Sequence, residues 1–416
     1  MVPKGWITKA LELTGVKVID GDRGKEYPKA SDFSGDGYCL FLSAKNVTKY
    51  GFQFNELQFI DAEKDKKLRK GRVKRSNIVL TTRGSVGHFA YYDASVPYDV
   101  MRINSGMVIL DADESDLEPN FLYALCRSFI VQKQIEAASF GSAQPQLTVG
   151  IVKGLKLPIP TLVEQKKIAQ ILSTWDKAIS VTEKLLANSQ QQKKALMQQL
   201  LTGKKRLLDE NGVRFSGEWE VVRLKQLIHE EKKRNRDNHI QRVLSVTNHS
   251  GFVLPEEQFS KRVASEDVST YKIVKKNQYG YNPSRLNVGS FARLDNYDEG
   301  VLSPMYVVFS INHERLNSDY FLNWMSSNEA KQRIAGSTQG SVRDSVGFDA
   351  LCSFSFSLPT LMEQQKIAAV LSAADAEMSM LEKKLACLKE EKKALMQQLL
   401  TGKRRVNVES EETVSA

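Results

Sequence analysis

Two copies of one long amphipathic segment constrain what this chain can fold into more than any other feature. Residues 160–204 realign on residues 359–403 at a constant shift of 199, with 28 identities in 45 positions and no gap. The last twelve residues of both copies, KKALMQQLLTGK, are identical. A surface helix without a partner would not keep twelve consecutive residues, exposed face included, so the repeat predicts a shared binding surface.

Each copy carries the signals that begin and end a helix. A T-x-x-E capping box opens each copy at Thr161 and Thr360, and its hydroxyl and carboxylate are expected to satisfy orphan backbone N–H groups. Gly203 and Gly402 follow the last apolar residues and supply the left-handed conformation that ends a helix. The intervening segment of about 38 residues predicts a rod of roughly 57 Å in each copy.

Apolar residues recur along both rods in alternating steps of four and three, which is heptad spacing. Neither rod is expected to stand alone in water, so the spacing predicts that they pack together. We expect an antiparallel pair, because a pseudo-twofold axis perpendicular to the rods reverses them. The predicted seam consists of Ile168, Leu172, Trp175, Ile179, Thr182, Leu186, Ser189, Lys193, Leu196 and Leu200 in the first rod, and Ile367, Leu371, Ala374, Met378, Leu381, Leu385, Leu388, Lys392, Leu395 and Leu399 in the second.

A globular segment precedes each rod. Short β-branched runs flanked by turn residues predict strands, and 3.6-residue periodicity predicts helices, so each segment is expected to be α/β or α+β. The strands are expected within residues 77–82, 105–110, 242–247 and 305–311, and the helices within residues 121–138 and 320–335. The predicted division is a first domain, residues 1–156; a central helix segment, 157–204; a second domain, 205–355; a C-terminal helix segment, 356–403; and a flexible tail, 404–416.

The charge of the chain favours an anionic partner such as nucleic acid. It has 59 Lys+Arg against 49 Asp+Glu, a formal charge of +10. Residues 61–75 and 223–242 concentrate basic side chains that would neutralise phosphates, although a solvated surface run is the alternative for either cluster. The phosphate-contacting candidates of the first cluster are Arg69, Lys70, Arg72, Lys74 and Arg75.

Two polar loops, residues 140–146 and 338–344, occupy equivalent places in the two halves. Their Ser, Gln and Arg side chains are types that pair with base edges and phosphate oxygens, although a plain turn is the alternative. Together with nearby arginines they give the base-reading candidates Arg83, Ser142, Gln144 and Gln146 in the first domain, and Arg285, Arg293, Gln339, Ser341 and Arg343 in the second.

No motif in the sequence indicates catalysis or a metal site. It contains no G-x-x-x-x-G-K-[ST], no G-x-S-x-G and no H-E-x-x-H, and its five histidines lack ligand spacing. The four scattered cysteines suggest neither disulfides nor a zinc site. Because the sequence has no run of 18 apolar residues and no secretory pattern at its start, we expect a cytoplasmic protein without membrane contact.

The segments LPIPTLVEQKKIAQIL and SLPTLMEQQKIAAVL, each followed by KKALMQQLLTGK, resemble the spacer helices of the specificity subunits of type I restriction-modification enzymes. The resemblance covers nearly the whole chain. It implies two target-recognition domains, each reading one half of a bipartite, asymmetric sequence in double-stranded DNA. It also implies two methyltransferase subunits docked on the helices and two ATP-driven restriction subunits in the full complex. S-adenosylmethionine, ATP and Mg would then bind the partners, and this chain would hold no cofactor.

The identical segments supply the candidate docking residues for such partners: Lys193, Lys194, Gln198, Gln199, Lys392, Lys393, Gln397 and Gln398.

Two other functions stay open from the residues alone. One is a non-catalytic scaffold whose domains bind proteins, which would show weak and salt-insensitive DNA binding. The other is a self-sufficient DNA-modifying enzyme, which would bind S-adenosylmethionine or cut DNA by itself.

Overall fold

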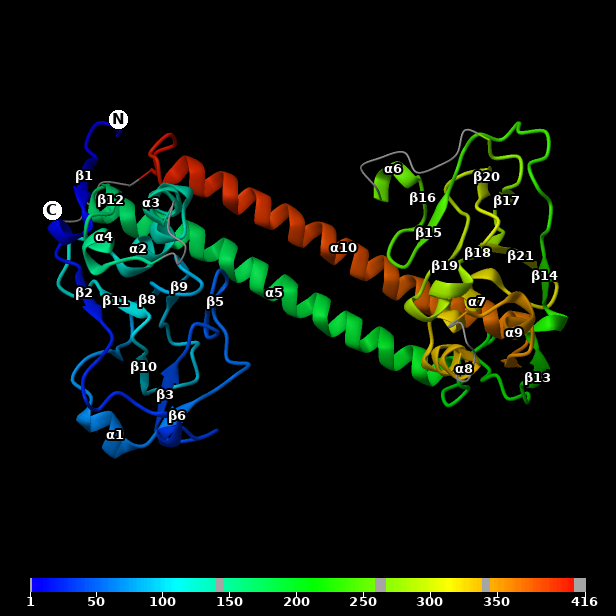
Figure 1. Cartoon of the computed structure of the whole chain (residues 1–416), viewed down its shortest axis with the longest axis horizontal. Helices are drawn as coiled ribbons and strands as arrows, with labels where there is room; N and C mark the ends of the chain where they lie inside the picture. The colour runs from blue at the N-terminus through cyan, green and yellow to red at the C-terminus, as the bar shows by residue number, and fades with distance from the viewer. Residues whose placement is uncertain (1, 140–145, 259–266, 339–344, 408–416) are drawn as a thin grey trace. The chain divides into compact units, whose positions relative to one another are not determined.

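The computed structural model describes residues 2–139, 146–258, 267–338 and 345–407. Backbone contacts divide the chain into two compact units, one made of Met1–Glu183 with Lys384–Ala416 and the other of Lys184–Lys383. The division runs through both long helices, so each unit holds one globular domain together with part of each helix (Figure 1).

Unit 1 places two four-stranded sheets and a layer of helices around its apolar cores. Its elements are β1 (Ile7–Ala10), η1 (Leu11–Thr14), β2 (Lys17–Asp20), η2 (Ala30–Asp32), β3 (Cys39–Leu42), β4 (Val47–Thr48), β5 (Gly51–Phe52), β6 (Phe59–Ile60), α1 (Ala62–Lys67), β7 (Arg72–Val73), β8 (Ile78–Thr81), β9 (Phe89–Tyr91), β10 (Met101–Ile103), β11 (Met107–Asp111), α2 (Pro119–Cys126), α3 (Phe129–Ser139), α4 (Val149–Lys153) and β12 (Lys156–Ile159). One sheet has the order β2-β11-β8-β9, and the other, β6-β3-β10-β7, contains the parallel pair β3 and β10.

Alternation along β11 explains why this strand is buried on both faces. Ile109 faces the apolar cluster shared with the second sheet, whereas Val108 and Leu110 face the cluster formed with α2 and α3. The ends of the two long helices close that second cluster through Ile168 and Leu399. The first domain is therefore anchored on the helix pair by its own core.

Among its described residues unit 2 has one four-stranded sheet, several two-stranded sheets and a core rich in aromatic rings. Its elements are β13 (Glu220–Arg223), η3 (Leu224–Gln226), β14 (Ile228–Glu230), β15 (Ser245–Thr247), β16 (Gly251–Val253), α6 (Pro255–Gln258), β17 (Lys272–Lys275), β18 (Tyr279–Tyr281), η4 (Pro283–Val288), β19 (Phe291–Arg293), β20 (Glu299–Leu302), β21 (Val307–Ile311), α7 (Ser318–Met325), α8 (Asn328–Thr338), α9 (Phe348–Cys352) and β22 (Ser355–Leu358). The main sheet has the order β14-β21-β18-β19. Tyr279 stacks on Phe309 with ring centroids 5.1 Å apart, and Trp324 meets Phe356 edge-on at 4.6 Å.

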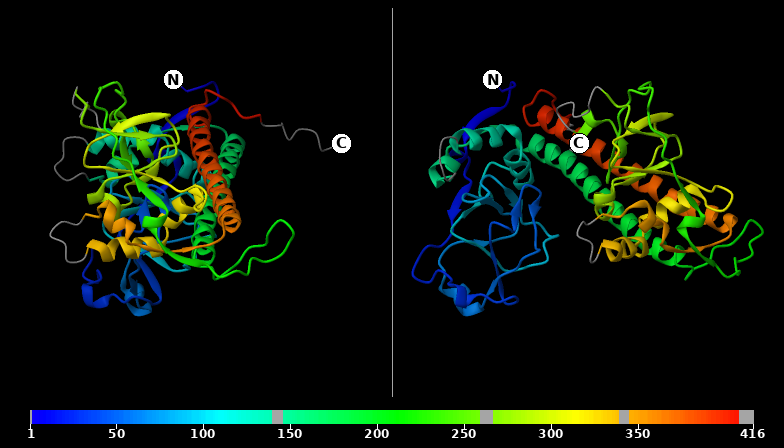
Figure 2. Two further views of the ribbon diagram at one scale, coloured as in Figure 1. Left: turned by 90° about the vertical axis from the view of Figure 1, so that its right-hand side faces the viewer. Right: turned by 45° about the vertical axis from the view of Figure 1, so that its right-hand side comes forward.

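The predicted rods are the helices α5 (Leu162–Leu200) and α10 (Leu361–Leu399), each 39 residues long. They pack side by side and antiparallel, as Figures 1 and 2 show. In unit 1 the ion pair Lys392–Asp176 joins the second half of α10 to the first half of α5, and in unit 2 the pair Lys193–Asp375 joins the opposite halves. The duplicated architecture of two α/β domains joined by long paired helices is confirmed.

Two local predictions need correction. The helices expected within residues 121–138 and 320–335 are each broken into two, α2 with α3 and α7 with α8. At the first break the Ser128 hydroxyl donates to the Leu125 carbonyl, and at the second the Ser327 hydroxyl accepts the Ala330 N–H, so both serines form local turns that compete with a continuous helix. The four predicted strands are present as β8, β11, β15 and β21.

The capping boxes are only half formed. Thr161 and Thr360 accept the N–H groups of Glu164 and Glu363 at 3.4 Å, as predicted. Glu164 accepts the Thr161 hydroxyl at 3.4 Å, and neither glutamate accepts the backbone N–H of its cap residue. Both instead bind arginines that follow the opposite helix, as described below. Gly203 and Gly402 end the helices with φ of +70° and +69°, which confirms their predicted role.

Candidate nucleic-acid interface

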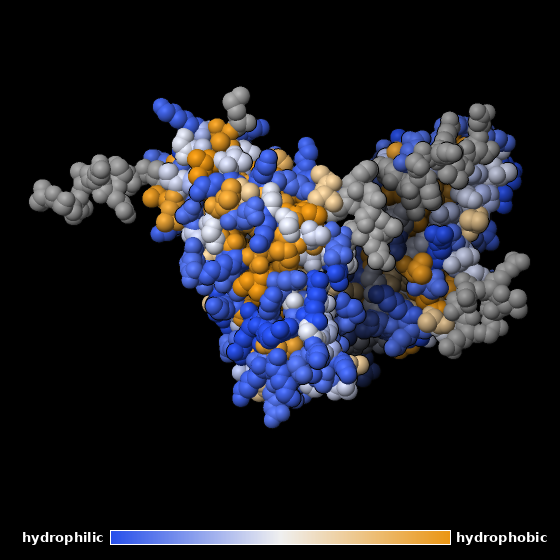
Figure 3. All heavy atoms as spheres, turned by 60° about the vertical axis from the view of Figure 1, so that its left-hand side comes forward, coloured by the Kyte–Doolittle hydropathy of each residue, from blue (hydrophilic) through white to orange (hydrophobic). Residues whose placement is uncertain are grey.

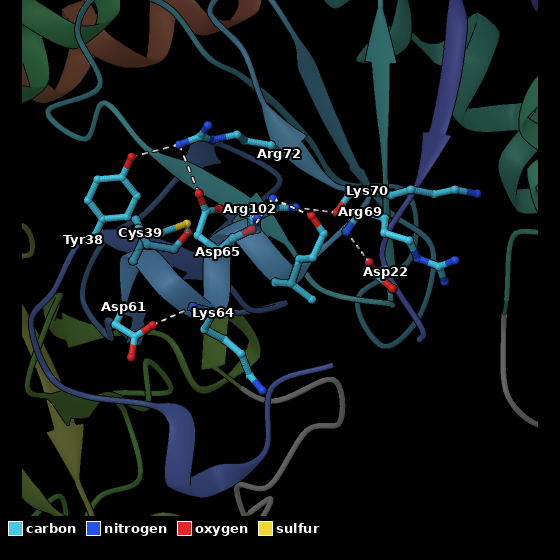
Figure 4. A network of polar contacts seen from close by, with 12 residues as sticks. Asp22, Tyr38, Cys39, Asp61, Lys64, Asp65, Arg69, Lys70, Arg72 and Arg102 are labelled. Atoms are coloured by element: carbon cyan, nitrogen blue, oxygen red, sulfur yellow. Dashed lines mark hydrogen bonds and ion pairs between the residues drawn. The ribbon is translucent and has the colours of Figure 1, made fainter. Parts of the chain in front are cut away.

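A basic loop, residues 69–71, joins α1 to β7 in the first domain, and together with Arg72, the first residue of β7, it carries three of the predicted DNA-binding cations. The buried guanidinium of Arg102, on β10, holds the backbone of this segment (Figure 4). Its Nη1 donates to the Lys70 carbonyl at 2.6 Å, and its Nη2 donates to the carbonyls of Asp65 and Leu68 at 2.8 and 3.1 Å. The loop is therefore held in one conformation by a side chain that DNA could not reach.

Two buried carboxylates complete this support. Asp65 accepts from Arg102 Nε and lies 3.1 Å from Arg72 Nη2. Asp22 accepts the N–H groups of Gly24 and Arg69 at 2.8 and 2.7 Å. The Gly24 N–H, opposed by burial and aided by the Arg69 N–H, lowers the pKa of Asp22. The stability that Asp22 contributes is therefore present above its unfolded pKa of about 4 and is lost as the pH falls through the lowered value.

The cations of this region differ in how many hydrogen bonds and ion pairs they already make within the domain. Arg69, Lys70, Arg72 and Lys74 are exposed. Arg75 is also exposed, but its guanidinium donates to the Val96 carbonyl at 3.1 Å and to Asp99 at 2.8 Å and lies 4.1 Å from the centre of the Tyr92 ring. These contacts within the domain argue against the predicted DNA contact of Arg75. Figure 3 shows mostly hydrophilic side chains over the end of unit 1 that carries α1.

Arg83 and Gln146, two predicted base-reading residues, are brought together. Their backbones form an antiparallel bridge next to β8. In the amide orientation that satisfies both groups, the Gln146 oxygen accepts from Arg83 Nη2 at 2.9 Å and from Nε at 3.1 Å. Both side chains are exposed, so the pair presents polar groups to solvent at one edge of the first domain. Ser142 and Gln144, in the same loop, lie outside the described residues.

In the second domain Arg285 is exposed on η4, whereas Arg293 is enclosed by acids. Arg293 Nε and Nη2 donate to the carboxylate of Asp295, and Nη1 donates to Asp319 at 2.8 Å. Burial would lower the pKa of Arg293, but these hydrogen bonds outweigh it and raise the pKa. Because both edges of the guanidinium are taken, the predicted base contact of Arg293 does not fit this geometry. Gln339, Ser341 and Arg343 lie outside the described residues.

Two of the predicted docking residues, Lys193 and Lys392, are engaged between α5 and α10 rather than presented to a partner. Lys193 pairs with Asp375, and Lys392 pairs with Asp176. The two pairs are related by the shift of 199 residues. Burial lowers the pKa of Lys392, and Asp176 opposes this effect. The other docking candidates, Lys194, Gln198, Gln199, Lys393, Gln397 and Gln398, are exposed.

We expect Lys392→Met to leave the thermal stability at pH 7 unchanged or slightly higher, because Met fills a heptad position without a desolvated charge. Asp176→Ala should instead cost about 1–2 kcal/mol, since it leaves a largely buried ammonium without its carboxylate, and the half-exposed acid keeps the cost below that of a fully buried pair. Thermal unfolding followed by circular dichroism measures both. A Lys392→Met protein less stable than the Asp176→Ala protein would contradict this view of the seam.

Further contacts related by the same shift escaped the sequence analysis. Gln165 accepts the Glu118 N–H at 2.9 Å and donates to the Asp116 and Pro160 carbonyls at 3.1 Å. Gln364, 199 positions later, makes the equivalent contacts in unit 2. Both glutamines are buried and tie the start of a long helix to its domain. Both copies carry Gln at this position, which lies outside the heptad seam, and this shared residue is the sequence feature that could have predicted the contact.

The buried glutamates are a second such pair. Glu363 accepts from Arg206 Nε and Nη2 at 2.6 and 2.8 Å and from the Trp219 indole at 3.0 Å. Glu164 accepts from Arg405 Nε at 2.7 Å. Each arginine lies just beyond the glycine that ends the neighbouring long helix. The beginning of one helix is thereby fastened to the end of the other in both units.

No cluster of three or more His, Cys, Asp or Glu side chains that could hold a metal ion occurs among the described residues. No helix in the described part of the chain combines the length and the apolar character needed to span a membrane.

A family model, the type I restriction modification DNA specificity domain, matches residues 5–188 and 216–390. The MjaVIII specificity subunit of Methanocaldococcus jannaschii is 24% identical over 325 residues, 73% of this chain and 74% of the relative. The putative MjaX specificity subunit of the same organism is 25% identical over 393 residues, 87% and 86% of the two chains.

Solved structures share the fold. The S subunit of a type I restriction-modification system from M. genitalium superposes with a TM-score of 0.59 at 12% identity, covering 96% of both chains. A chain from a structural study of complex assembly and conformational transition of the type I R-M system gives 0.56 at 16% identity, covering 97% of this chain and 100% of the other. The chain therefore belongs to the family of type I restriction-modification DNA specificity subunits, the non-catalytic components that recognise the DNA target of these enzymes.

Proposed function

We propose that each globular domain reads one half of a bipartite, asymmetric target and that the helix pair carries two equivalent docking sites for methyltransferase subunits. The observation that carries this proposal is the duplication itself. Contacts that fasten a domain to the helices recur at a shift of 199, from Gln165 to Gln364 and from Glu164 to Glu363. Ion pairs inside the domains, such as Arg75–Asp99 in the first and Arg293–Asp319 in the second, do not recur at that shift. Two domains that are attached to the helices in the same way but differ in their polar groups fit a target with two different half-sites.

The exposed residues of the repeated segment support the docking sites. Lys194 and Gln198 line a cavity of about 290 Å³ in unit 2 whose apolar wall includes Met197, Leu201 and Met378. An apolar depression with a cationic rim suits an apolar side chain on an acidic partner surface. Lys393 and Gln397 occupy the matching positions on α10. Two restriction subunits would complete the complex, and S-adenosylmethionine, ATP and Mg would bind to the partner subunits.

The test is to purify the chain with its methyltransferase subunit, measure the stoichiometry by native mass spectrometry, and sequence methylated adenines in DNA treated with the complex. The expected result is a complex of two methyltransferase subunits with one specificity subunit, and methylation at a single interrupted, asymmetric motif. Lys194→Glu and Lys393→Glu should each remove one methyltransferase subunit. A one-to-one complex, or methylation at a continuous motif, would contradict the proposal.

A further inference from the structure

Arg72 differs from the buried Arg102 and from Arg293 in how few of its donors are used. In Arg102, the nitrogens Nε, Nη1 and Nη2 all donate hydrogen bonds within the first domain. In Arg293 of the second domain, all three donate to Asp295 and Asp319. In Arg72 only Nη2 is engaged, at 3.1 Å from Asp65 and 3.2 Å from the Tyr38 hydroxyl. Among the described residues, Nε and Nη1 of Arg72 donate no hydrogen bond, and about half of the side chain is exposed.

The two neighbours of Nη2 are unequal. A guanidinium offers two edges for paired hydrogen bonds, and both edges include Nη2. Figure 4 shows Asp65 and Tyr38 approaching Nη2 from different sides. Asp65 is charged, 3% exposed and fixed by Arg102, whereas Tyr38 is neutral and 51% exposed. The contact to Asp65 is therefore permanent, and the contact to Tyr38 is the one that a ligand can replace.

The position of Asp65 selects the kind of ligand. Guanine presents N7 and O6 as a pair of acceptors in the major groove, and arginine reads this pair with two hydrogen bonds. A phosphate also offers paired acceptors. The Asp65 carboxylate, which Arg72 shares with Arg102, offsets part of the charge of Arg72 and weakens its attraction for an anion. An arginine held by a carboxylate keeps its directional donors and attracts phosphate less strongly than a free arginine. The base edge is thus the better match.

The support beneath the loop lowers the cost of this contact. Arg102 and Asp22 fix the backbone at Leu68, Arg69 and Lys70, and the Ile103 N–H donates to the Gly71 carbonyl at 2.9 Å. Little backbone freedom is therefore lost when Arg72 engages a base. We propose that Arg72 reads a guanine in the half-site of the first domain, with guanine N7 and O6 taking the place of the Tyr38 hydroxyl and Asp65 acting as the positioning residue. This inference rests on the proposed function of the domain.

The experiment compares the methylation motifs produced by complexes that carry the wild-type chain, Arg72→Ala or Arg72→Lys. The wild-type motif should contain a guanine at one fixed position of one half-site. Arg72→Ala should lower the preference for that guanine by about 5- to 150-fold and leave every other position unchanged. Arg72→Lys should retain only part of the preference, because an ammonium cannot make the planar paired contact.

Three further variants sharpen the result. Lys67 is an exposed cation of the same basic segment. Lys67→Ala should weaken DNA binding equally at all sequences and reduce the slope of log affinity against log salt concentration by about one, without changing the methylation motif. Tyr38→Phe should keep the guanine preference with equal or tighter binding, and weaker binding would overturn the proposed exchange. Asp65→Asn should lower the preference for guanine at that position and leave the preferences at the other positions of the same half-site unchanged. A general loss of stability would lower methylation without this selective effect.

The possible failures are distinguishable. If the complex methylates no bipartite motif, the proposed function fails and this inference fails with it. If the bipartite motif persists and Arg72→Ala changes no position, or lowers methylation uniformly, the proposed function stands and Arg72 is not a base-reading residue.

Discussion

Glu363→Ala is expected to lower the stability of unit 2 by about 3–5 kcal/mol. Glu363 is only 1% exposed and is the common acceptor for both the Arg206 guanidinium and the Trp219 indole N–H. Its removal would leave a mostly buried cation and an indole donor without their partner. The arginine cannot recover these hydrogen bonds from water without opening the junction between the end of α5 and the start of α10.

Glu164→Ala is the matched variant. The Arg405 side chain is 43% exposed, compared with 20% for Arg206, so after the loss of its glutamate it can turn to water. We expect a cost of about 1–2 kcal/mol for this variant, because solvent screens an ion pair that is partly exposed. Urea unfolding of the full chain, followed by circular dichroism and tryptophan fluorescence, compares the two. Equal losses would show that the Trp219 hydrogen bond and the deeper burial of Arg206 add nothing.

Gly21→Ala is expected to cost about 3 kcal/mol, at the upper end of what overpacking in a core costs. A Cβ atom at this position would lie 2.3 Å from the Asn104 carbonyl oxygen and 3.1 Å from Ser105 Cα. These are backbone atoms, which cannot rotate away as a flexible side chain would. Since Gly21 precedes Asp22, whose carboxylate holds the Arg69 N–H, the shift should also weaken DNA binding at the first half-site.

Gly35→Ala provides the control for this prediction. An added Cβ there would meet no atom within 4 Å, so its thermal stability should match that of the wild-type chain within about 0.5 kcal/mol. Thermal unfolding measures both variants, and a fluorescence anisotropy titration with target DNA measures binding. A Gly21→Ala protein with wild-type stability would show that the segments around Gly21 and Asn104 are not packed as closely as described.

The sequence predicted the parts of this protein whose signals are periodic or local. Heptad spacing located both long helices and the residues between them, and Gly203 and Gly402 marked their ends. Lys193 and Lys392 were predicted as seam residues from the heptad spacing and as docking candidates from the repeat. Each pairs with an aspartate on the opposite helix, which agrees with the seam position.

The sequence by itself determined the duplication, the helix pair and the family, because these depend on the order and period of residues along the chain. Only the tertiary structure decided which cations remain available for DNA. The sequence shows the same residue type at Arg72, Arg75, Arg102 and Arg293. The number of their donors that are engaged differs, because it depends on which acceptors the fold brings near: Asp65 to Arg72, Asp99 to Arg75, the Lys70 carbonyl to Arg102 and Asp319 to Arg293. A hydrogen bond depends on distance and direction in space, and neither is written in the local pattern of residues.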